Sequence, residues 1–228
     1  MQPQITPAAQ GAARTRAYNI ETPDRILDAA ERLFAARNYQ TVTLRQIAHE
    51  AGANVGQIVY HFGKKETLVG EAIRRRAGEL NAERLALLTQ YEALVGPDNV
   101  EIEPLVRAIL MPYFQRLESG DAQWQAFATF VGRSVWDGQL SAWMSESFDE
   151  VAQLYIAAFR RALPGLGPAD AVRSFHFLMA LMHAAAVRDS RIEGLIAAAG
   201  GATSPRAYSR ILVPYIAAGI RAIAEGAG

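Results

Sequence analysis

The 228-residue chain contains no cysteine, which excludes disulfide bonds, thiolate zinc sites and thiol catalysis. It also lacks a long hydrophobic run, since the longest uncharged apolar stretch, residues 174–187, is too short to cross a bilayer. The N-terminus does not show the pattern of a signal peptide, which is a basic segment followed by an apolar one. Together these absences predict a cytoplasmic chain that inserts into no membrane.

An excess of one charge is missing as well, because the formal net charge is zero. The balance differs along the chain: residues 1–84 carry 12 basic and 9 acidic side chains, whereas residues 85–228 carry 11 and 14. A neutral chain can still bind nucleic acid if its cations gather on one face. The charge bias alone is too small to indicate such a partner.

No sustained alternation of apolar and polar residues predicts a β-strand, and apolar residues recur instead at helical spacing. We predict an all-α fold with a flexible tail over residues 1–20, a three-helix N-terminal domain over 21–66 and a C-terminal helical bundle over 67–228. Thr22 is expected to cap the first helix, with Pro23 at its first position. The expected helices cover residues 22–37, 43–51, 55–62, 65–94, 103–119, 122–136, 147–163, 168–190 and 205–225.

The most informative segment reads TLRQIAHEAGANVGQIVYHF, residues 43–62. Thr43 can cap a short helix, and Gln46 three residues later completes a capping box. Gly52 ends this helix, and a second short helix follows the turn. This order is typical of a helix-turn-helix, in which the second helix enters the DNA major groove.

The start of the second short helix is expected to read bases. Gln57 can form two hydrogen bonds with adenine, and Val55 can contact a thymine methyl group. Gly56 lets the backbone approach the duplex, and Asn54 precedes it in the turn. The hydroxyl of Thr43 lies at a helix N-terminus, where backbone N–H groups favour phosphate.

Polar and cationic side chains around this helix are expected to hold phosphates. They are Tyr60, His61, Lys64 and Lys65 at its far end and Arg45 on the preceding helix. Each has a structural alternative. Tyr60 can serve in packing, His61 as a helix C-cap and the two lysines as solvated charge.

The run ILDAAERLFAARNYQTVTLRQIAHEAGANVGQIVYHFGKKETL, within residues 24–68, resembles the TetR family of one-component transcriptional regulators. The resemblance implies DNA contacts by Thr43, Asn54, Val55, Gly56, Gln57, Tyr60, His61 and Lys65. The chain departs from the family pattern at several positions, including Gln57 in place of a small residue, which leaves the operator sequence open. The resemblance further implies a C-terminal domain that dimerises and binds a small effector. The expected function is a homodimeric repressor that binds a palindromic double-stranded DNA operator and is released by a small, largely apolar molecule.

The expected dimer contact uses the helices near residues 168–190 and 205–225, whose small residues permit close approach. An intramolecular core pair is the alternative. Aromatic and Met side chains with few polar groups predict an apolar effector pocket, with simple core packing as the alternative. Arg133 in this set can meet a ligand carboxylate. The candidate pocket residues are Ile109, Met111, Phe114, Trp124, Phe127, Phe130, Arg133, Phe159, Phe177 and Met182, together with Leu105, Val131, Trp136 and Tyr155.

No metal site or cofactor is expected. His176 and His183 are seven residues apart on a predicted helix, but metal binding would need a further converging ligand. Residues 132–136 begin like a nucleophile elbow but lack its final glycine and follow no strand. The chain is therefore not expected to be an enzyme. A helical dimerisation or adaptor protein without DNA binding is the alternative function.

Overall fold

The computed structural model describes residues 8–134, 138, 140–187 and 189–226. Within these ranges every regular element is an α-helix, which confirms the predicted fold class. The chain divides into two compact units, one ending at Ala72 and the other beginning at Ile73. No helix of the described part is long and apolar enough to cross a membrane.

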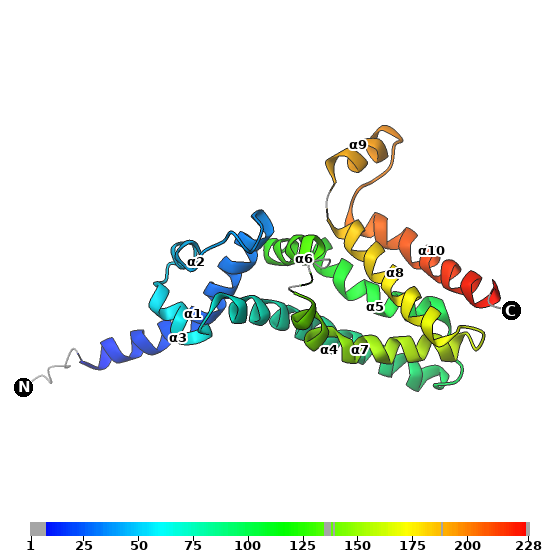
Figure 1. Ribbon diagram of the computed structural model, residues 1–228, viewed down its shortest axis with the longest axis horizontal. Coiled ribbons are helices and arrows are strands. Elements are labelled where there is room, and N and C mark those ends of the chain that lie inside the picture. Colours follow the sequence, from blue (N-terminus) through cyan, green and yellow to red (C-terminus); the bar gives the residue numbers. More distant parts are fainter. Residues whose placement is uncertain (1–7, 135–137, 139, 188, 227–228) are drawn as a thin grey trace, which may run out of the picture. The chain divides into compact units, whose positions relative to one another are not determined.

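The first unit contains α1 (Ala8–Ala36), α2 (Leu44–Glu50), α3 (Val55–Phe62) and the start of α4 (Lys65–Val95) (Figure 1). Helix α1 packs against both α2 and α3, and α2 packs against α3. Their apolar faces form one small core, to which each helix contributes buried side chains. Its best-buried side chains are Ile26, Ala30, Phe34, Ile47 and Ile58.

The predicted start of the first helix was wrong. Helix α1 begins at Ala8, and Pro23 lies inside it instead of at its first position. Alanine has the highest helix propensity, and the segment before Thr22 contains several alanines, so the helix extends backward through it. Residues 8–20 of the predicted flexible tail are thus helical, and residues 1–7 lie outside the described ranges.

The second unit is built around α5 (Ile102–Glu118), which packs against α6 (Ala122–Ser134), α7 (Ser141–Ala162), α8 (Pro168–Ala186) and α10 (Pro205–Gly226). Most residues on the inner faces of α5 are buried, including Tyr113 and Phe114. Phe127, Phe130 and Phe159 from the surrounding helices are also fully buried. These large side chains give the bundle an aromatic interior.

One helix of this unit was not predicted. Helix α8 ends at Ala186, and a separate helix α9 (Ser190–Ala198) follows it. The Asp189 carboxylate accepts hydrogen bonds from the backbone N–H groups of Arg191 and Ile192, which caps the start of α9. Figure 1 shows α9 projecting from the helices around α5, and it contributes no buried residue.

Candidate functional site

The helix-turn-helix is fixed by two capping boxes. Gln46 Oε1 accepts the backbone N–H of Thr43 at 2.8 Å, and Thr43 Oγ1 accepts the N–H of Gln46 at 3.3 Å. In the same way Asn54 Oδ1 accepts the N–H of Gln57 at 2.9 Å, and Gln57 Oε1 accepts the N–H of Asn54 at 3.0 Å. Between the helices Gly52 has a φ of +59°, which favours glycine. These local contacts set the start and direction of α3.

Helix α3 turns one face inward and leaves the other open. Ile58 and Phe62 are buried, whereas Tyr60 is 84% exposed and Val59 is 50% exposed. The Tyr60 and His61 rings meet edge to face with centroids 5.0 Å apart. The exposure of Tyr60 contradicts its alternative role in packing. Gly56, Arg45 and Thr43 are also exposed, while Val55 and Gln57 are half-buried, and their DNA contacts stay predictions.

The two neighbouring lysines after α3 differ in their exposure and in their hydrogen bonds. Lys64 is exposed, whereas Lys65 Nζ donates to the backbone carbonyls of Tyr39, Gln40 and Val42 at 3.2, 2.9 and 3.1 Å. An ammonium group has three donors, so this arrangement uses all of them. Through these bonds Lys65 holds the turn that leads into α2. Its predicted phosphate contact would compete with them and stays a prediction.

The candidate pocket residues of the second unit do not converge on one hollow. Phe127, Val131 and Met182 line a cavity of about 10 Å³ in the interior. Arg133 lines an open cavity of about 520 Å³ between α6 and the ends of α8 and α10, and Phe177 lines a groove between α8 and α10. Core positions, 0–5% exposed, are occupied by Leu105, Ile109, Phe114, Trp124, Phe130, Tyr155 and Phe159.

Two further members of the predicted set need separate mention. Met111 is half-buried on α5. Trp136 lies outside the described residues. A ligand role for either one stays a prediction.

Sequence reasoning missed three polar residues in the interior of this unit. Arg84, Tyr113 and His183 are 2%, 1% and 6% exposed, and all three line the 10 Å³ cavity. Burial lowers the pKa of Arg84 to about 10, so its guanidinium stays charged at neutral pH. Burial, assisted by the Arg84 cation, lowers the pKa of His183 to about 4, so the imidazole is neutral there.

The sequence did carry a signal for Arg84. It lies four residues after Leu80 and four before Leu88, both buried on α4, so a cation occupies a position of the apolar stripe. His183 was noticed only as a partner for His176, which is exposed. Among the described residues no three His, Cys, Asp or Glu side chains gather as a metal site would require.

Comparison with known proteins gives two family matches. Residues 26–72 match the model for bacterial regulatory proteins of the tetR family, and residues 107–219 match the model for the tetracyclin repressor-like C-terminal domain. The crystal structure of HlyIIR, a hemolysin II transcriptional regulator, has a TM-score of 0.56 at 16% identity, covering 88% of this chain and 97% of that one. At this identity the likeness supports the fold alone.

Curated relatives match mainly in the N-terminal part. The transcriptional regulator SrpR of Pseudomonas putida is 45% identical over 58 residues, which are 25% of this chain and 27% of the relative. The regulator TtgR, also of Pseudomonas putida, is 34% identical over 106 residues, or 46% of each chain. The repressor KstR2 of Mycobacterium tuberculosis is 32% identical over 98 residues, 43% of this chain and 45% of the relative. The chain thus spans less than half the length of these relatives.

All of these proteins are named as regulators or repressors, which confirms the prediction that the chain is not an enzyme. The helix-turn-helix with its two capping boxes lies inside the first matched segment, and α5 to α10 cover the second. The chain belongs to the TetR family of helix-turn-helix transcriptional regulators.

Proposed function

We propose that the chain is a homodimeric, ligand-responsive repressor that acts in the cytoplasm on a palindromic operator. The observation that carries this proposal is the open face of α3, where Asn54 caps the N-terminus and Tyr60 is exposed in the last turn. A short helix held by its own caps presents its first turn as a rigid unit to base edges. Lys64 and Arg45 on the flanking segments supply exposed cations for phosphates.

Base reading by Gln57 is testable with an internal control. Gln57→Ala removes one capping-box hydrogen bond and the proposed adenine contact, so discrimination at one position of each half-site should fall by about 1–3 kcal/mol. Gln46→Ala removes the equivalent bond of α2 and should leave base preference unchanged. Gel shifts against the promoter beside the chain's own gene, with single-base operator variants, measure both effects.

Identical relaxation of preference in the Gln46 and Gln57 variants would show that the cap, and not a base contact, is responsible. Absence of any shift for the unaltered protein at micromolar concentration would favour the adaptor function instead. Binding that weakens steeply as salt is raised supports the regulator.

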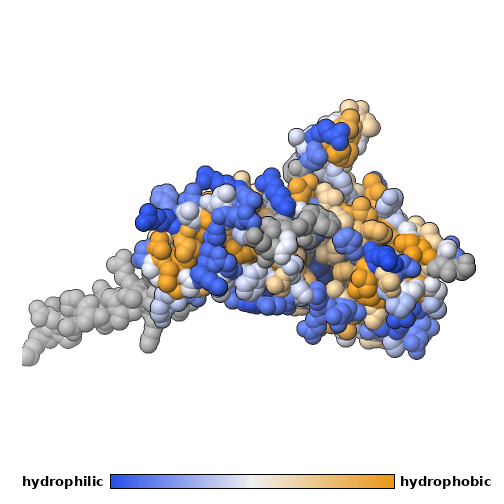
Figure 2. Space-filling view, in the orientation of Figure 1, coloured by the Kyte–Doolittle hydropathy of each residue, from blue (hydrophilic) through white to orange (hydrophobic). Residues whose placement is uncertain are grey.

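The dimer contact is proposed on α8 and α10. Phe177 on α8 and Ile211 and Tyr215 on α10 are 54%, 62% and 66% exposed, and a groove of about 330 Å³ with apolar walls runs between the two helices. Figure 2 shows apolar surface, in orange, over this part of the second unit. Contiguous exposed apolar side chains of this kind mark an interface.

Phe177→Asp should raise the dimer dissociation constant at least about tenfold, because a carboxylate would lose its water inside the contact. Light scattering after size-exclusion chromatography measures the oligomeric state. Leu94→Asp is the matched control, since Leu94 is 82% exposed on α4, outside the proposed contact. If Leu94→Asp separates the dimer and Phe177→Asp does not, the contact lies elsewhere.

The effector response is proposed to pass through α4. This helix begins at Lys65, whose ammonium group holds the turn before α2, and continues to Val95 in the second unit. A ligand that prefers one position of α4 biases the turn that Lys65 holds. A tenfold loss of DNA affinity requires a coupling free energy of only about 1.4 kcal/mol.

A further inference from the structure

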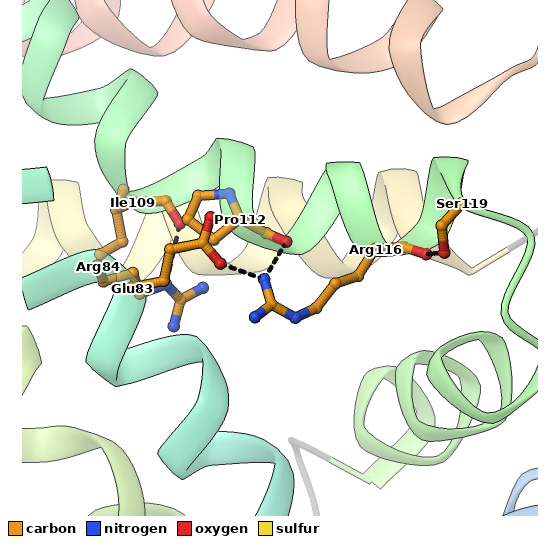
Figure 3. Close-up of polar contacts among 6 residues, drawn as sticks. All are labelled: Glu83, Arg84, Ile109, Pro112, Arg116 and Ser119. Atoms are coloured by element: carbon orange, nitrogen blue, oxygen red, sulfur yellow. Dashed lines mark hydrogen bonds and ion pairs between the residues drawn. The ribbon is translucent and has the colours of Figure 1, made fainter. Parts of the chain in front are cut away.

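Two arginines of the second unit differ in how their charge is compensated. Arg116 forms an ion pair with the Glu83 carboxylate and donates a hydrogen bond to the Pro112 carbonyl (Figure 3). Its guanidinium lies 4.9 Å from the centre of the Trp124 ring. Arg84 donates from Nε to the Ile109 carbonyl at 3.0 Å (Figure 3). Its Nη2 donates to the Met182 sulfur at 3.7 Å. Among the described residues no carboxylate pairs with Arg84.

A guanidinium has five donors, and thioether sulfur is a weak acceptor. Arg84 is only 2% exposed, so bulk solvent contributes little to compensating its charge. Charged groups at such depth are otherwise paired, because an uncompensated buried charge costs several kcal/mol. The fold therefore keeps a cation in its interior without the anion that would stabilise it.

Two more polar side chains without partners lie beside this cation. The Tyr113 hydroxyl and both ring nitrogens of His183 are buried and have no hydrogen-bond partner in the described part of the chain. The two rings meet edge to face with centroids 6.0 Å apart. Buried polar groups are normally hydrogen-bonded, so these unsatisfied atoms around one cavity point to a missing ligand.

The remaining walls of this cavity are apolar. They include Met144, Met179 and Met182, whose unbranched side chains change rotamer readily. At about 10 Å³ the cavity has room for about one water molecule, so a larger ligand must displace these side chains as it enters. The apolar wall is completed by Leu80, Phe127, Val131 and Phe148.

We propose that Arg84, Tyr113 and His183 bind the carboxylate of an effector whose remaining part is apolar and lies among the Met and Phe side chains. The planar guanidinium fits a carboxylate through paired hydrogen bonds, and the Tyr113 hydroxyl and the His183 N–H complete its acceptors. One cation matches one negative charge. A neutral ligand would leave Arg84 unpaired, and a dianion would bring an excess charge into the interior.

This assignment rests on the proposed function, in that the second unit responds to a small molecule. It also predicts a change in thermal stability that can be measured in the absence of DNA. A cation kept for a ligand destabilises the empty protein, so Arg84→Met should raise the melting temperature, and Tyr113→Phe should leave it unchanged or raise it. Arg116→Met is the matched control, because it removes a paired and stacked arginine and should lower the melting temperature.

The binding test uses the full-length dimer and isothermal titration calorimetry. The probes are straight-chain carboxylates from hexanoate to dodecanoate and 3-phenylpropanoate, each compared with its primary amide. We expect at least one acid to bind at micromolar concentration and its amide at least tenfold more weakly. Arg84→Met should lose at least tenfold in affinity for the acid, Tyr113→Phe should lose less, and Arg116→Met should retain it.

The assignment is overturned if no acid in the series binds, if acid and amide bind equally, or if Arg84→Met melts earlier than the unaltered protein. Because these measurements contain no DNA, they separate this site from the proposed repressor activity. Gel shifts then address the second question. An acid that releases the unaltered protein from its operator should fail to release Arg84→Met. That result would link the site to the response.

Discussion

Lys65→Met is expected to lower the free energy of unfolding of the N-terminal unit by about 3 kcal/mol, since hydrogen bonds from a charged donor contribute about 1.5–3 kcal/mol each and are not additive. The variant removes all three bonds to the carbonyls of Tyr39, Gln40 and Val42. Native-state hydrogen exchange at the buried Ile47 and Ile58 amides measures this unit separately from the second one. DNA affinity should fall with stability, because the turn before Thr43 loses its support.

Lys64→Met is the matched control on the neighbouring residue. Lys64 is exposed, so its loss should leave hydrogen exchange nearly unchanged, while the salt dependence of DNA binding should decrease by about one phosphate contact. The reverse result, with stability unchanged in Lys65→Met and the salt slope reduced, would return Lys65 to the phosphate contact that the sequence predicts.

Acid should destabilise the second unit through His183. In the unfolded chain this histidine has a pKa of about 6.5, whereas burial lowers its pKa in the native protein to about 4. Between these values the unfolded chain binds more protons than the native one, so stability is complete above about pH 6.5 and is lost as the pH falls toward 4. The slope approaches about 1.4 kcal/mol per pH unit, and below about pH 4 this contribution no longer changes.

Urea unfolding at pH values from about 4.5 to 7.5 spans this window and measures the slope. His183→Gln is the control, because it retains a polar side chain of similar size that does not titrate. The variant should be less dependent on pH in this window, whatever its stability at neutral pH. Parallel curves for both proteins would place the acid sensitivity in other groups and contradict a neutral, buried His183.

The helix-turn-helix was predictable because its determinants are local. The pair Thr43–Gln46 occurs at capping-box spacing, and Gly52 marks the turn, so short-range chemistry alone indicates two helices and their order. The second box, Asn54–Gln57, has the same spacing but was not predicted. The backward extension of α1 was not predicted, because a proline such as Pro23 is typical of the first position of a helix. Propensity along the alanine-rich segment outweighs the cost of one internal proline.

The second unit was less predictable because its chemistry depends on tertiary neighbours. Phe127 and Met182 line the buried cavity. Phe130 and Phe159 are also aromatic residues on helices, but they pack in the core and do not line this cavity. Likewise Lys64 and Lys65 are equivalent in sequence, and only the folded turn shows which ammonium is engaged. Nothing in the sequence brings Arg84, Tyr113 and His183 together, since they come from three different helices.

Helix α9 is a suitable site for attaching a spectroscopic label. It contributes nothing to the interior, and Leu195 on it is 59% exposed. Since the chain has no thiol of its own, Leu195→Cys would provide the single attachment point for a maleimide fluorophore or a spin label in each protomer. In the proposed dimer, the separation of two such labels would then report on changes in the second unit as the proposed carboxylate ligands are titrated.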